Sequence, residues 1–301
     1  MRILLLGANG QVGHELRRSL LTIASVVAAT RTGRLDDGAP CEVADLESLD
    51  QLPTLVEKVA PDLVVNAAAY TAVDRAEDER EAAFRINAEA PAVIAQTCAA
   101  AGIALVHYST DYVFDGQATR PYSEDDATAP LGVYGASKLA GEEAIRASGA
   151  RHLIFRTAWV YGARGRNFLL SMLQRARQRE ALRVVADQHG TPTPAWLIAD
   201  ITARVIAEHS HAEGTYHLTA NGGTHWQGFA QTLLNEAAVL GLINQAPSVA
   251  AINSADYPTR AARPTYSRLD NSKLQNLLGE EMPDWTRALD PVLESLADLN
   301  P

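Results

Sequence analysis

Apolar and polar positions alternate along the chain between two periods. Short apolar runs, typical of buried strands, are separated by longer amphipathic segments, typical of helices. The runs lie at residues 3–6, 24–29, 63–65 and 103–106, and the segments at residues 12–21, 46–59 and 82–101. This alternation predicts βαβ units, and therefore an α/β fold: a Rossmann-type, doubly wound parallel sheet with helices on both faces.

The alternation weakens after about Thr157. Helical stretches at 168–179 and 195–209 follow, separated by the turn-forming segments "HGTPTP" and "TANGG". We therefore expect a dinucleotide-binding core over residues 1–157 and a smaller, mixed substrate-binding lobe mainly over residues 158–301. Because no Gly/Ser-rich linker separates them, we expect the two parts to interleave.

The segment "GANGQVG" follows the first predicted strand and opens a helix. Gly7 permits a tight turn, Gly10 lets the backbone approach a diphosphate, and Gly13 lets the helix lie close to the sheet. The N–H groups at the helix start then face the phosphates. Those groups belong to Gln11 and Val12. Asn9 stands where GxGxxG has its middle glycine, so a glycine-rich turn without a nucleotide is the alternative.

The end of the second predicted strand bears on the choice of cofactor. An acidic residue there commonly binds the adenosine ribose, whereas a basic residue favours the 2′-phosphate of NADP. This chain has Thr30 and Arg31, with Arg34 nearby, which favours NADPH over NADH unless Arg31 points into solvent. Asp45 and Leu46 are placed to contact the adenine, although Asp45 would also suit a helix N-cap.

Small residues follow the next strand. Ala67, Ala68 and Ala69 leave room for a cofactor to lie across the strand ends. The acidic sequence that continues through Glu81 is interpreted as a solvated helix face.

Two further segments carry candidate chemistry. In "YGASK", Tyr134 and Lys138 lie four residues apart and project from one helix face, where an ammonium would favour the phenolate. In "STDYVFDG", the polar residues Ser109, Thr110 and Asp111 end a strand, which is where α/β sheets bind ligands, although a simple turn has the same composition. A YxxxK alone is common; with the glycine loop it indicates an oxidoreductase.

Composition limits the remaining possibilities. The formal net charge of −10 argues against a nucleic-acid-binding surface, and no apolar run approaches the length of a membrane span. Cys41 and Cys98 are far apart, and the eight histidines show no metal-ligand spacing, so neither a disulfide framework nor a catalytic metal is expected. The first residues do not resemble a signal peptide, which favours a cytoplasmic location.

Taken together, these segments resemble those of the extended short-chain dehydrogenase/reductase family. The matching segments, in order over nearly the whole chain, are "GANGQVG", "NAAAYTAVDRAE", "HYSTDYVFDG", "APLGVYGASKLAGE", "FRTAWVYG", "DQHGTPT" and "YPTRAARPTYSRL". "STDYVFDG" with "FRTAWVYG" is similar to a narrow group within the family. That resemblance implies NAD(P)H-dependent reduction of the 4-keto group of dTDP-4-dehydro-β-L-rhamnose to dTDP-L-rhamnose, a nucleotide sugar used in polysaccharide biosynthesis.

The resemblance also implies residue roles. Tyr134 protonates the developing alkoxide as hydride arrives at C4, while Lys138 holds the nicotinamide ribose and lowers the pKa of the tyrosine. Thr110 donates a hydrogen bond to the reacting carbonyl and, together with Asp111 and Trp159, binds the sugar. The positions that line the cofactor are Ala69, Tyr70, Thr71 and Tyr108. We further expect an anion-binding pocket for the diphosphate, formed by Arg260, Arg263 and Arg268.

Two departures from the family pattern matter. Thr30 and Arg31 stand where an acidic residue is often found, which leaves the cofactor preference open. Some relatives are thought to dimerise through magnesium held by two glutamates; Glu15 matches the first, but Trp196 stands at the second. No metal is therefore expected, and the chain is expected to be a monomer or a weak homodimer. The competing functions are another nucleotide-sugar reductase or epimerase and, from a different class, a non-catalytic dinucleotide-binding regulatory subunit.

Overall fold

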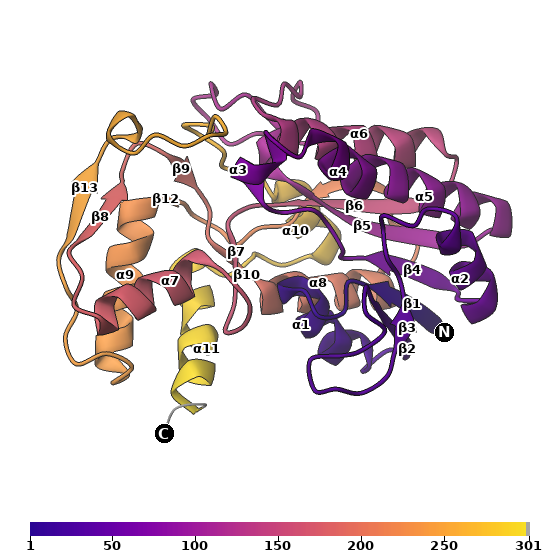
Figure 1. The fold of residues 1–301 in the computed structure, drawn as a ribbon, viewed down its shortest axis with the longest axis horizontal. Helices are drawn as coiled ribbons and strands as arrows, with labels where there is room; N and C mark the ends of the chain where they lie inside the picture. The colour runs from indigo at the N-terminus through magenta and orange to yellow at the C-terminus, as the bar shows by residue number, and fades with distance from the viewer. Residues whose placement is uncertain (299–301) are drawn as a thin grey trace.

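The structure, a computed structural model, describes residues 1–298 and consists of two lobes that lie side by side (Figure 1). The larger lobe is built on a seven-stranded sheet with the strand order β11-β6-β5-β4-β1-β2-β3, in which all neighbouring strands are parallel. The strands are β1 Arg2–Leu6, β2 Ser25–Thr30, β3 Glu42–Val43, β4 Leu63–Asn66, β5 Ala104–Thr110, β6 His152–Thr157 and β11 Gly214–His217. The predicted fold class is confirmed.

Alternate residues of the central strands face two separate cores. Ile3 and Leu5 of β1 pack on the face covered by α1 and α8, whereas Leu4 and Leu6 pack on the face covered by α2, α5 and α6 (Figure 1). These helices are α1 Gln11–Leu20, α2 Gln51–Val59, α5 Ala90–Ala101, α6 Val133–Ala147 and α8 Ala195–Glu208. Burial on both faces explains why the central strands are mostly apolar, with buried polar residues such as Asn66 and His107 only toward their carboxyl ends.

Two predicted helices differ from the observed elements. The segment at 82–101 is divided into α4 Arg80–Phe84, a π-helical turn η1 at Arg85–Glu89, and α5. The segment at 46–59 becomes helical only at Gln51, because turns precede it. Asp50 occupies the N-cap position of α2, so the alternative that Asp45 caps a helix is wrong.

The smaller lobe is formed by helices and short strand pairs of the second half of the chain (Figure 1). Its helices are α7 Phe168–Arg177, α9 Trp226–Val239, α10 Ser272–Leu278 and α11 Trp285–Asp298. The paired strands are β7 Val160–Tyr161 with β10 Thr193–Pro194, β8 Leu182–Val185 with β13 Val249–Ile252, and β9 His189–Gly190 with β12 Thr224–His225. The predicted "HGTPTP" turn thus contains two short strands.

Two elements of the second half belong to the larger lobe. Strand β11 extends the main sheet beside β6, and helix α8 packs along α1. Short helical elements complete the chain: α3 Val73–Ala76, η2 Asp111–Val113 and η3 Ser254–Asp256. Between residues 1 and 298, no helix is both long and apolar enough to cross a membrane.

Candidate active site

The glycine loop has the geometry of a phosphate-binding turn. Gly7 has φ +78°, and a Cβ atom there would lie 2.7 Å from the backbone nitrogen of Ala68. A Cβ at Gly13 would overlap the Gly7 carbonyl group, so glycine lets α1 start directly against the loop. A Cβ at Gly10 would meet only backbone oxygens, the nearest being that of Gly7 at 3.2 Å. This open side lies at the start of α1, where the first N–H groups have no intrahelical acceptor.

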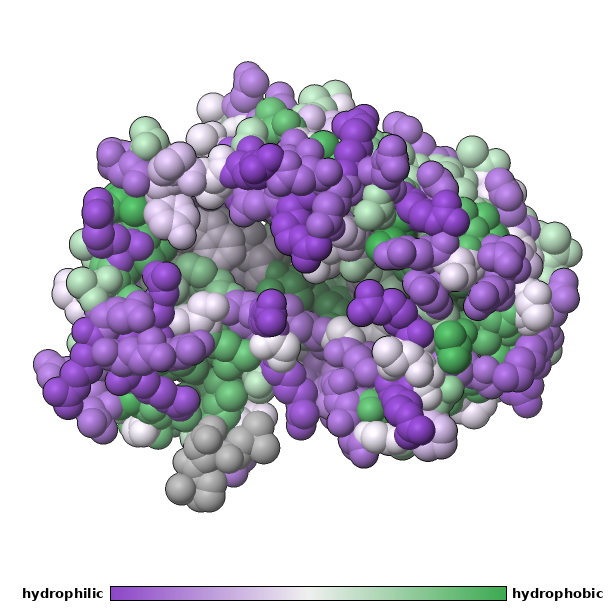
Figure 2. Space-filling view, in the orientation of Figure 1, coloured by the Kyte–Doolittle hydropathy of each residue, from purple (hydrophilic) through white to green (hydrophobic). Residues whose placement is uncertain are grey.

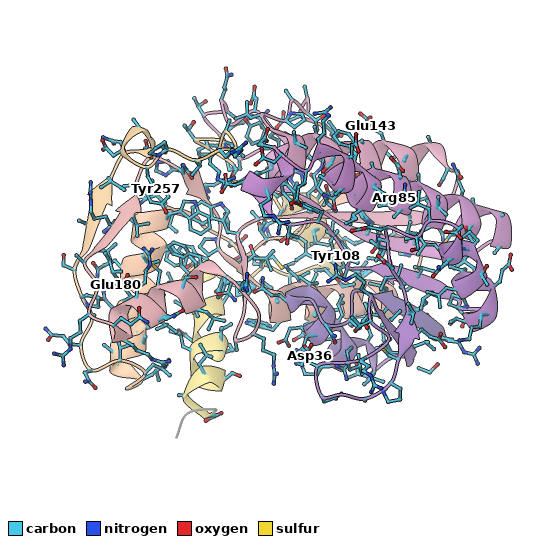
Figure 3. The ribbon with its side chains drawn as sticks, viewed as in Figure 1. Asp36, Arg85, Tyr108, Glu143, Glu180 and Tyr257 are labelled. Atoms are coloured by element: carbon cyan, nitrogen blue, oxygen red, sulfur yellow. The ribbon has the colours of Figure 1, made fainter. Side chains whose placement is uncertain are left out.

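Asn9 connects the glycine loop to the segment after β2 through two hydrogen bonds. Its Nδ2 donates to the Arg34 carbonyl at 3.0 Å, and its Oδ1 accepts from the Asp36 backbone N–H at 3.2 Å. Asp36 lies in the loop labelled beneath the sheet in Figure 3. Thr30 is buried and bonded to Arg34, whereas Arg31 is exposed and makes no hydrogen bond or ion pair with any described residue. Sequence reasoning treated Asn9 only as a departure from GxGxxG and missed this role.

The segment after β4 is held by two asparagines. Asn66 Oδ1 accepts from the Ala68 backbone N–H at 3.1 Å, and Asn87 Oδ1 accepts from that of Tyr70 at 2.9 Å. Asn87 is fully buried in η1, and its Nδ2 donates to the Tyr70 carbonyl and to Ser137 Oγ, each at 3.0 Å. Residues 67–71 are thereby fixed against α6. Sequence reasoning missed Asn87, because nothing in this amphipathic segment distinguishes it from polar neighbours such as Arg85 and Glu89.

Tyr134 lies in the first turn of α6, beside Thr110 and edge-on to the ring of Tyr112. Burial raises the pKa of Tyr134 to about 12, the Thr110 hydroxyl lowers it, and the charge of Asp111 raises it. The Lys138 Nζ points to β5, where it donates to the Tyr108 carbonyl at 2.6 Å. The expectation that Lys138 lowers the pKa of Tyr134 is wrong for this arrangement, because the lysine is bound to the strand.

Tyr108 lies near the centre of the molecule, in β5 (Figure 3). Its side chain is buried, and its hydroxyl is 2.9 Å from Thr202 Oγ1 of α8. The Tyr108 side chain thus points to α8, and its carbonyl group accepts from Lys138. The role of Tyr108 in lining the cofactor stays a prediction. Ser109 points to the opposite side of β5, near Glu142 of α6, where its hydroxyl helps to lower the pKa of that carboxyl without forming a hydrogen bond of normal geometry.

Thr110 and Asp111 lie where β5 passes into η2. Thr110 Oγ1 donates to Asp111 Oδ1 at 3.1 Å and accepts from the Tyr112 backbone N–H at 3.2 Å. Asp111 is 2% exposed. Burial raises its pKa to about 7, while hydrogen bonds from Ser267 and Thr110 lower it. The turn predicted as an alternative therefore exists, and it is also where two candidate site residues meet Tyr134.

Trp159 stands at the boundary between the lobes, in the left-handed backbone region with φ +48°. Its ring is stacked on Trp226, with ring centroids 3.6 Å apart and an interplanar angle of 5°. A Cβ atom at Gly190 would lie 2.6 Å from Trp159 Nε1, so a glycine is required beside the ring. Figure 2 shows that the molecule is hollowed between its two lobes. A small cavity of about 10 Å³ beside Tyr134 is lined in part by Tyr112 and Pro264.

Two of the three arginines expected to bind the diphosphate are already paired. Arg263 Nη2 lies 2.7 Å from Asp74 Oδ2, and Arg260 forms an ion pair with Asp78. The three-arginine pocket stays a prediction: within residues 1–298, the buried Nη1 of Arg263 and the buried Nε of Arg268 have no hydrogen-bond partner. The acidic segment is largely exposed, as a solvated face would be, and two of its carboxylates, those of Asp74 and Asp78, also form ion pairs with the distant arginines.

Helix α6 has two further carboxylate contacts. Glu77 Oε1 accepts from the Val133 backbone N–H at 2.8 Å at the start of α6. Farther along, buried Glu142 accepts from Arg156 Nε at 2.9 Å and from its Nη2 at 2.7 Å. Burial would raise the pKa of Glu142, but the hydrogen bonds and charge of Arg156 lower it below its usual range. Sequence reasoning missed this pair because its members lie on different elements.

The residues at the family's magnesium positions have other partners here. Glu15 is 3.5 Å from Arg18, and Trp196 Nε1 donates to the Ala288 carbonyl at 3.2 Å. No group of three or more His, Cys, Asp or Glu side chains in residues 1–298 is arranged to hold a metal ion. The absence of a metal stays a prediction. Burial raises the pKa of the Cys98 thiol to about 12.

Comparison with known proteins places this geometry among nucleotide-sugar enzymes. Residues 1–298 match the family described as the RmlD substrate binding domain. The dTDP-4-dehydrorhamnose reductase of Burkholderia thailandensis is 46% identical over 96% of this chain and 97% of its own. That of Shigella flexneri is 43% identical over 98% of both chains. The crystal structure of the Bacillus anthracis reductase in complex with NADP has a TM-score of 0.88 and 32% identity, covering 98% of this chain and 99% of that one.

Proposed function

Because the chain belongs to the family of the RmlD substrate binding domain, we propose that it is a reductase of a dTDP-4-keto-6-deoxy-sugar. The reaction is the NADPH-dependent reduction of the 4-keto group of dTDP-4-dehydro-β-L-rhamnose to dTDP-L-rhamnose. The observation that carries the proposal is the meeting of Thr110 and Tyr134 at the strand ends, beside a lysine and an open glycine loop.

Tyr134 is proposed as the proton donor. Its pKa of about 12 keeps the phenol protonated at neutral pH, which suits the reductive direction. NADPH supplies the hydride when it is bound. As hydride adds to C4 and the carbonyl double bond opens, the Tyr134 proton passes to the oxygen. Thr110 orients that oxygen, and Lys138 holds the nicotinamide ribose.

The residues of the glycine loop fit a dinucleotide. The open side of Gly10 and the start of α1 receive the diphosphate, because a side chain at residue 10 would fill that space. The full proposed set is Gly7, Gly10, Gln11, Val12, Gly13, Arg31, Asp45, Leu46, Ala68, Ala69, Tyr70, Thr71, Tyr108, Tyr134 and Lys138. NADPH is proposed over NADH because Arg31 follows β2 at the position where an acidic residue would bind the adenosine ribose, and because no ion pair within residues 1–298 competes for its guanidinium.

The substrate is proposed to lie between the lobes. Asp111 and Trp159, with Thr110, contact the sugar. Arg263 and Arg268, each with a buried nitrogen that has no partner within residues 1–298, are the candidates for the diphosphate. Residues 1–157 would then supply the cofactor site and residues 158–301 most of the substrate site, with α8 and β11 as the interleaved elements. We further propose that the enzyme is cytoplasmic. We also propose a monomer or weak homodimer, because Trp196 stands at the position of a magnesium ligand in some relatives.

The proposal is tested by adding the dTDP-4-keto-sugar and its 3,5-epimerase to the protein with NADPH or NADH. We expect NADPH oxidation, a lower KM for NADPH than for NADH, and dTDP-L-rhamnose identified by NMR. A sugar product formed without net cofactor oxidation would favour an epimerase instead. Absence of any reaction, with NADPH still bound, would favour the non-catalytic alternative.

A further inference from the structure

Three buried polar side chains form a chain behind the proposed active site. Lys138 Nζ lies 3.2 Å from His107 Nε2, and His107 Nδ1 lies 3.2 Å from Asn66 Nδ2. All three residues are 2% exposed or less. None of the reaction steps above uses His107 or Asn66. Buried polar groups of this kind must satisfy one another, because water does not reach them.

The hydrogen atoms of this chain follow from one backbone contact. Asn66 Oδ1 accepts from the Ala68 N–H at 3.1 Å, and an amide nitrogen could not accept there. The Asn66 NH₂ group therefore faces His107 and must donate to its Nδ1. A neutral imidazole carries one proton, so the proton of His107 is on Nε2. Burial and the charge of Lys138 hold the pKa of His107 well below its usual value, which keeps the ring neutral.

This tautomer places a donor in front of Lys138. The lysine Nζ already donates to the Tyr108 carbonyl at 2.6 Å. A neutral amine has a lone pair that accepts from His107 Nε2–H, whereas an ammonium has only donors. Protonation of Lys138 therefore requires the His107 proton to move to Nδ1 and the Asn66 amide to turn over. The Ala68 N–H then loses its acceptor.

We propose that His107 and Asn66 are positioning residues that couple the charge of Lys138 to the backbone hydrogen bond of Ala68 in the cofactor-lining segment. The neutral amine completes every hydrogen bond of the network, and the ammonium breaks one of them. Ala68 also lies directly against Gly7 of the phosphate loop. The protonation of the lysine and the geometry of the cofactor site are thus linked through two side chains. This inference rests on the proposed function only in assigning the cofactor to that segment.

The charges around Lys138 agree with this account. His107 faces it from β5, and Tyr134 and Glu142 lie four residues before and after it on α6. Burial lowers the pKa of Lys138 to about 8, and the charge of Glu142 raises it. The negative charge of Glu142 is balanced by the positive charge of Arg156, with which it forms a bidentate pair. The ammonium therefore gains little from the nearest carboxylate.

The test is ¹⁵N NMR of the histidine rings in the full-length protein, without substrate, between about pH 6 and 10. The signal lost in His107→Gln identifies His107. We expect this ring to stay neutral and to change from the Nδ1–H to the Nε2–H tautomer as the pH rises through the lysine titration. In Lys138→Met, which has no ionisable group there, the tautomer should not depend on pH. Buried His217, which does not contact Lys138, is the internal control.

A second variant changes the network without removing the histidine. Asn66→Asp can accept from both the Ala68 N–H and a His107 Nδ1–H, so it should hold His107 as Nδ1–H throughout. The midpoint of the pH dependence of NADPH binding should then rise by at least one pH unit, whereas His217→Gln should leave it unchanged. A wild-type His107 tautomer that is constant with pH, or wild-type behaviour of Asn66→Asp, would overturn the inference. Neither readout depends on which sugar is reduced.

Discussion

Burial sets the protonation of two proposed site residues near the end of β5, Tyr134 and Asp111. Tyr134 remains a phenol because an anion would be poorly solvated there, and its pKa of about 12 makes it an acid rather than a base at neutral pH. Asp111, with a pKa of about 7, is partly ionised under the same conditions. Substrate contacts at this point are therefore expected to depend on pH.

Replacing Tyr134 by phenylalanine removes the proposed acid and keeps the ring. We expect turnover to fall by about 10²–10⁴-fold, with NADPH binding nearly unchanged. Steady-state kinetics and cofactor titration measure the two effects. Tyr161→Phe is the matched control, because the Tyr161 hydroxyl is buried without a hydrogen-bond partner among residues 1–298. Full activity in Tyr134→Phe would remove Tyr134 from the mechanism.

Asp111 should make stability depend on pH. Its pKa in the folded protein is about 7, above the ordinary value of 3.8, so the folded state binds this proton more tightly. The stabilisation is fully present below pH 3.8 and is lost as the pH rises through 7. Asp111→Asn cannot ionise, so its Tm should fall less than that of the wild type between about pH 5 and 8. Parallel curves for the two proteins would contradict the raised pKa.

At the scale of single residues, motif spacing predicted that Tyr134, Lys138 and Thr110 are neighbours, because a strand end and the first turn of a helix meet in this fold. It did not predict where the Lys138 side chain points. That direction is set by the Tyr108 carbonyl and the His107 ring, which lie on β5 and carry no spacing signal.

Helix α6 is the element that positions the proposed chemistry. Glu77 binds its first turn, Asn87 binds Ser137 in its middle, and Arg156 binds Glu142 farther along. These contacts come from three different elements and fix the rotation of the helix as well as its position. Hydrophobic periodicity predicted such helices on both faces of the sheet, but it ran through the π-helical turn at 85–89 without a break. Apolar positions alone do not reveal where that turn interrupts the helix.

Breaking the buried pair tests the role of this element. Glu142→Gln keeps the shape of the side chain and leaves the Arg156 charge buried without a counter-ion. We expect a loss of about 3–5 kcal/mol in the free energy of unfolding, measured by denaturant titration. The control is Glu208→Gln, which alters an exposed pair with Arg204 and should change stability little. Equal effects of the two substitutions would show that burial of the first pair is unimportant.

At the scale of the whole molecule, the two lobes are joined across the site by charge. The loop at residues 257–264, which begins at Tyr257 in Figure 3, is bound to the acidic segment at 73–79 through Asp74 and Asp78. Part of this loop lines the cavity beside Tyr134. The absence of a linker predicted interleaved lobes, but the partners of these carboxylates lie far away in the sequence, and only the folded chain brings them together.

Neutralising both carboxylates should loosen one wall of the substrate site. For Asp74→Asn with Asp78→Asn, we expect KM for the sugar to rise by about 2- to 10-fold, as suits two partly exposed ion pairs. The dissociation constant of NADPH should not change, because neither carboxylate belongs to the proposed cofactor set and Glu79, which binds Tyr70, is left intact. Asp125→Asn removes an equivalent exposed charge elsewhere and serves as the control. A change in NADPH affinity without a change in KM would contradict this assignment.

The central claim, hydride delivery to C4 of a dTDP-4-keto-sugar, is tested most directly with cofactor that carries deuterium at both hydrogen positions of nicotinamide C4. The account predicts one equivalent of NADPD oxidised for each dTDP-L-rhamnose formed, with deuterium at C4 of the sugar in the NMR spectrum. A sugar product that carries no deuterium, or a cofactor that remains reduced, would contradict it.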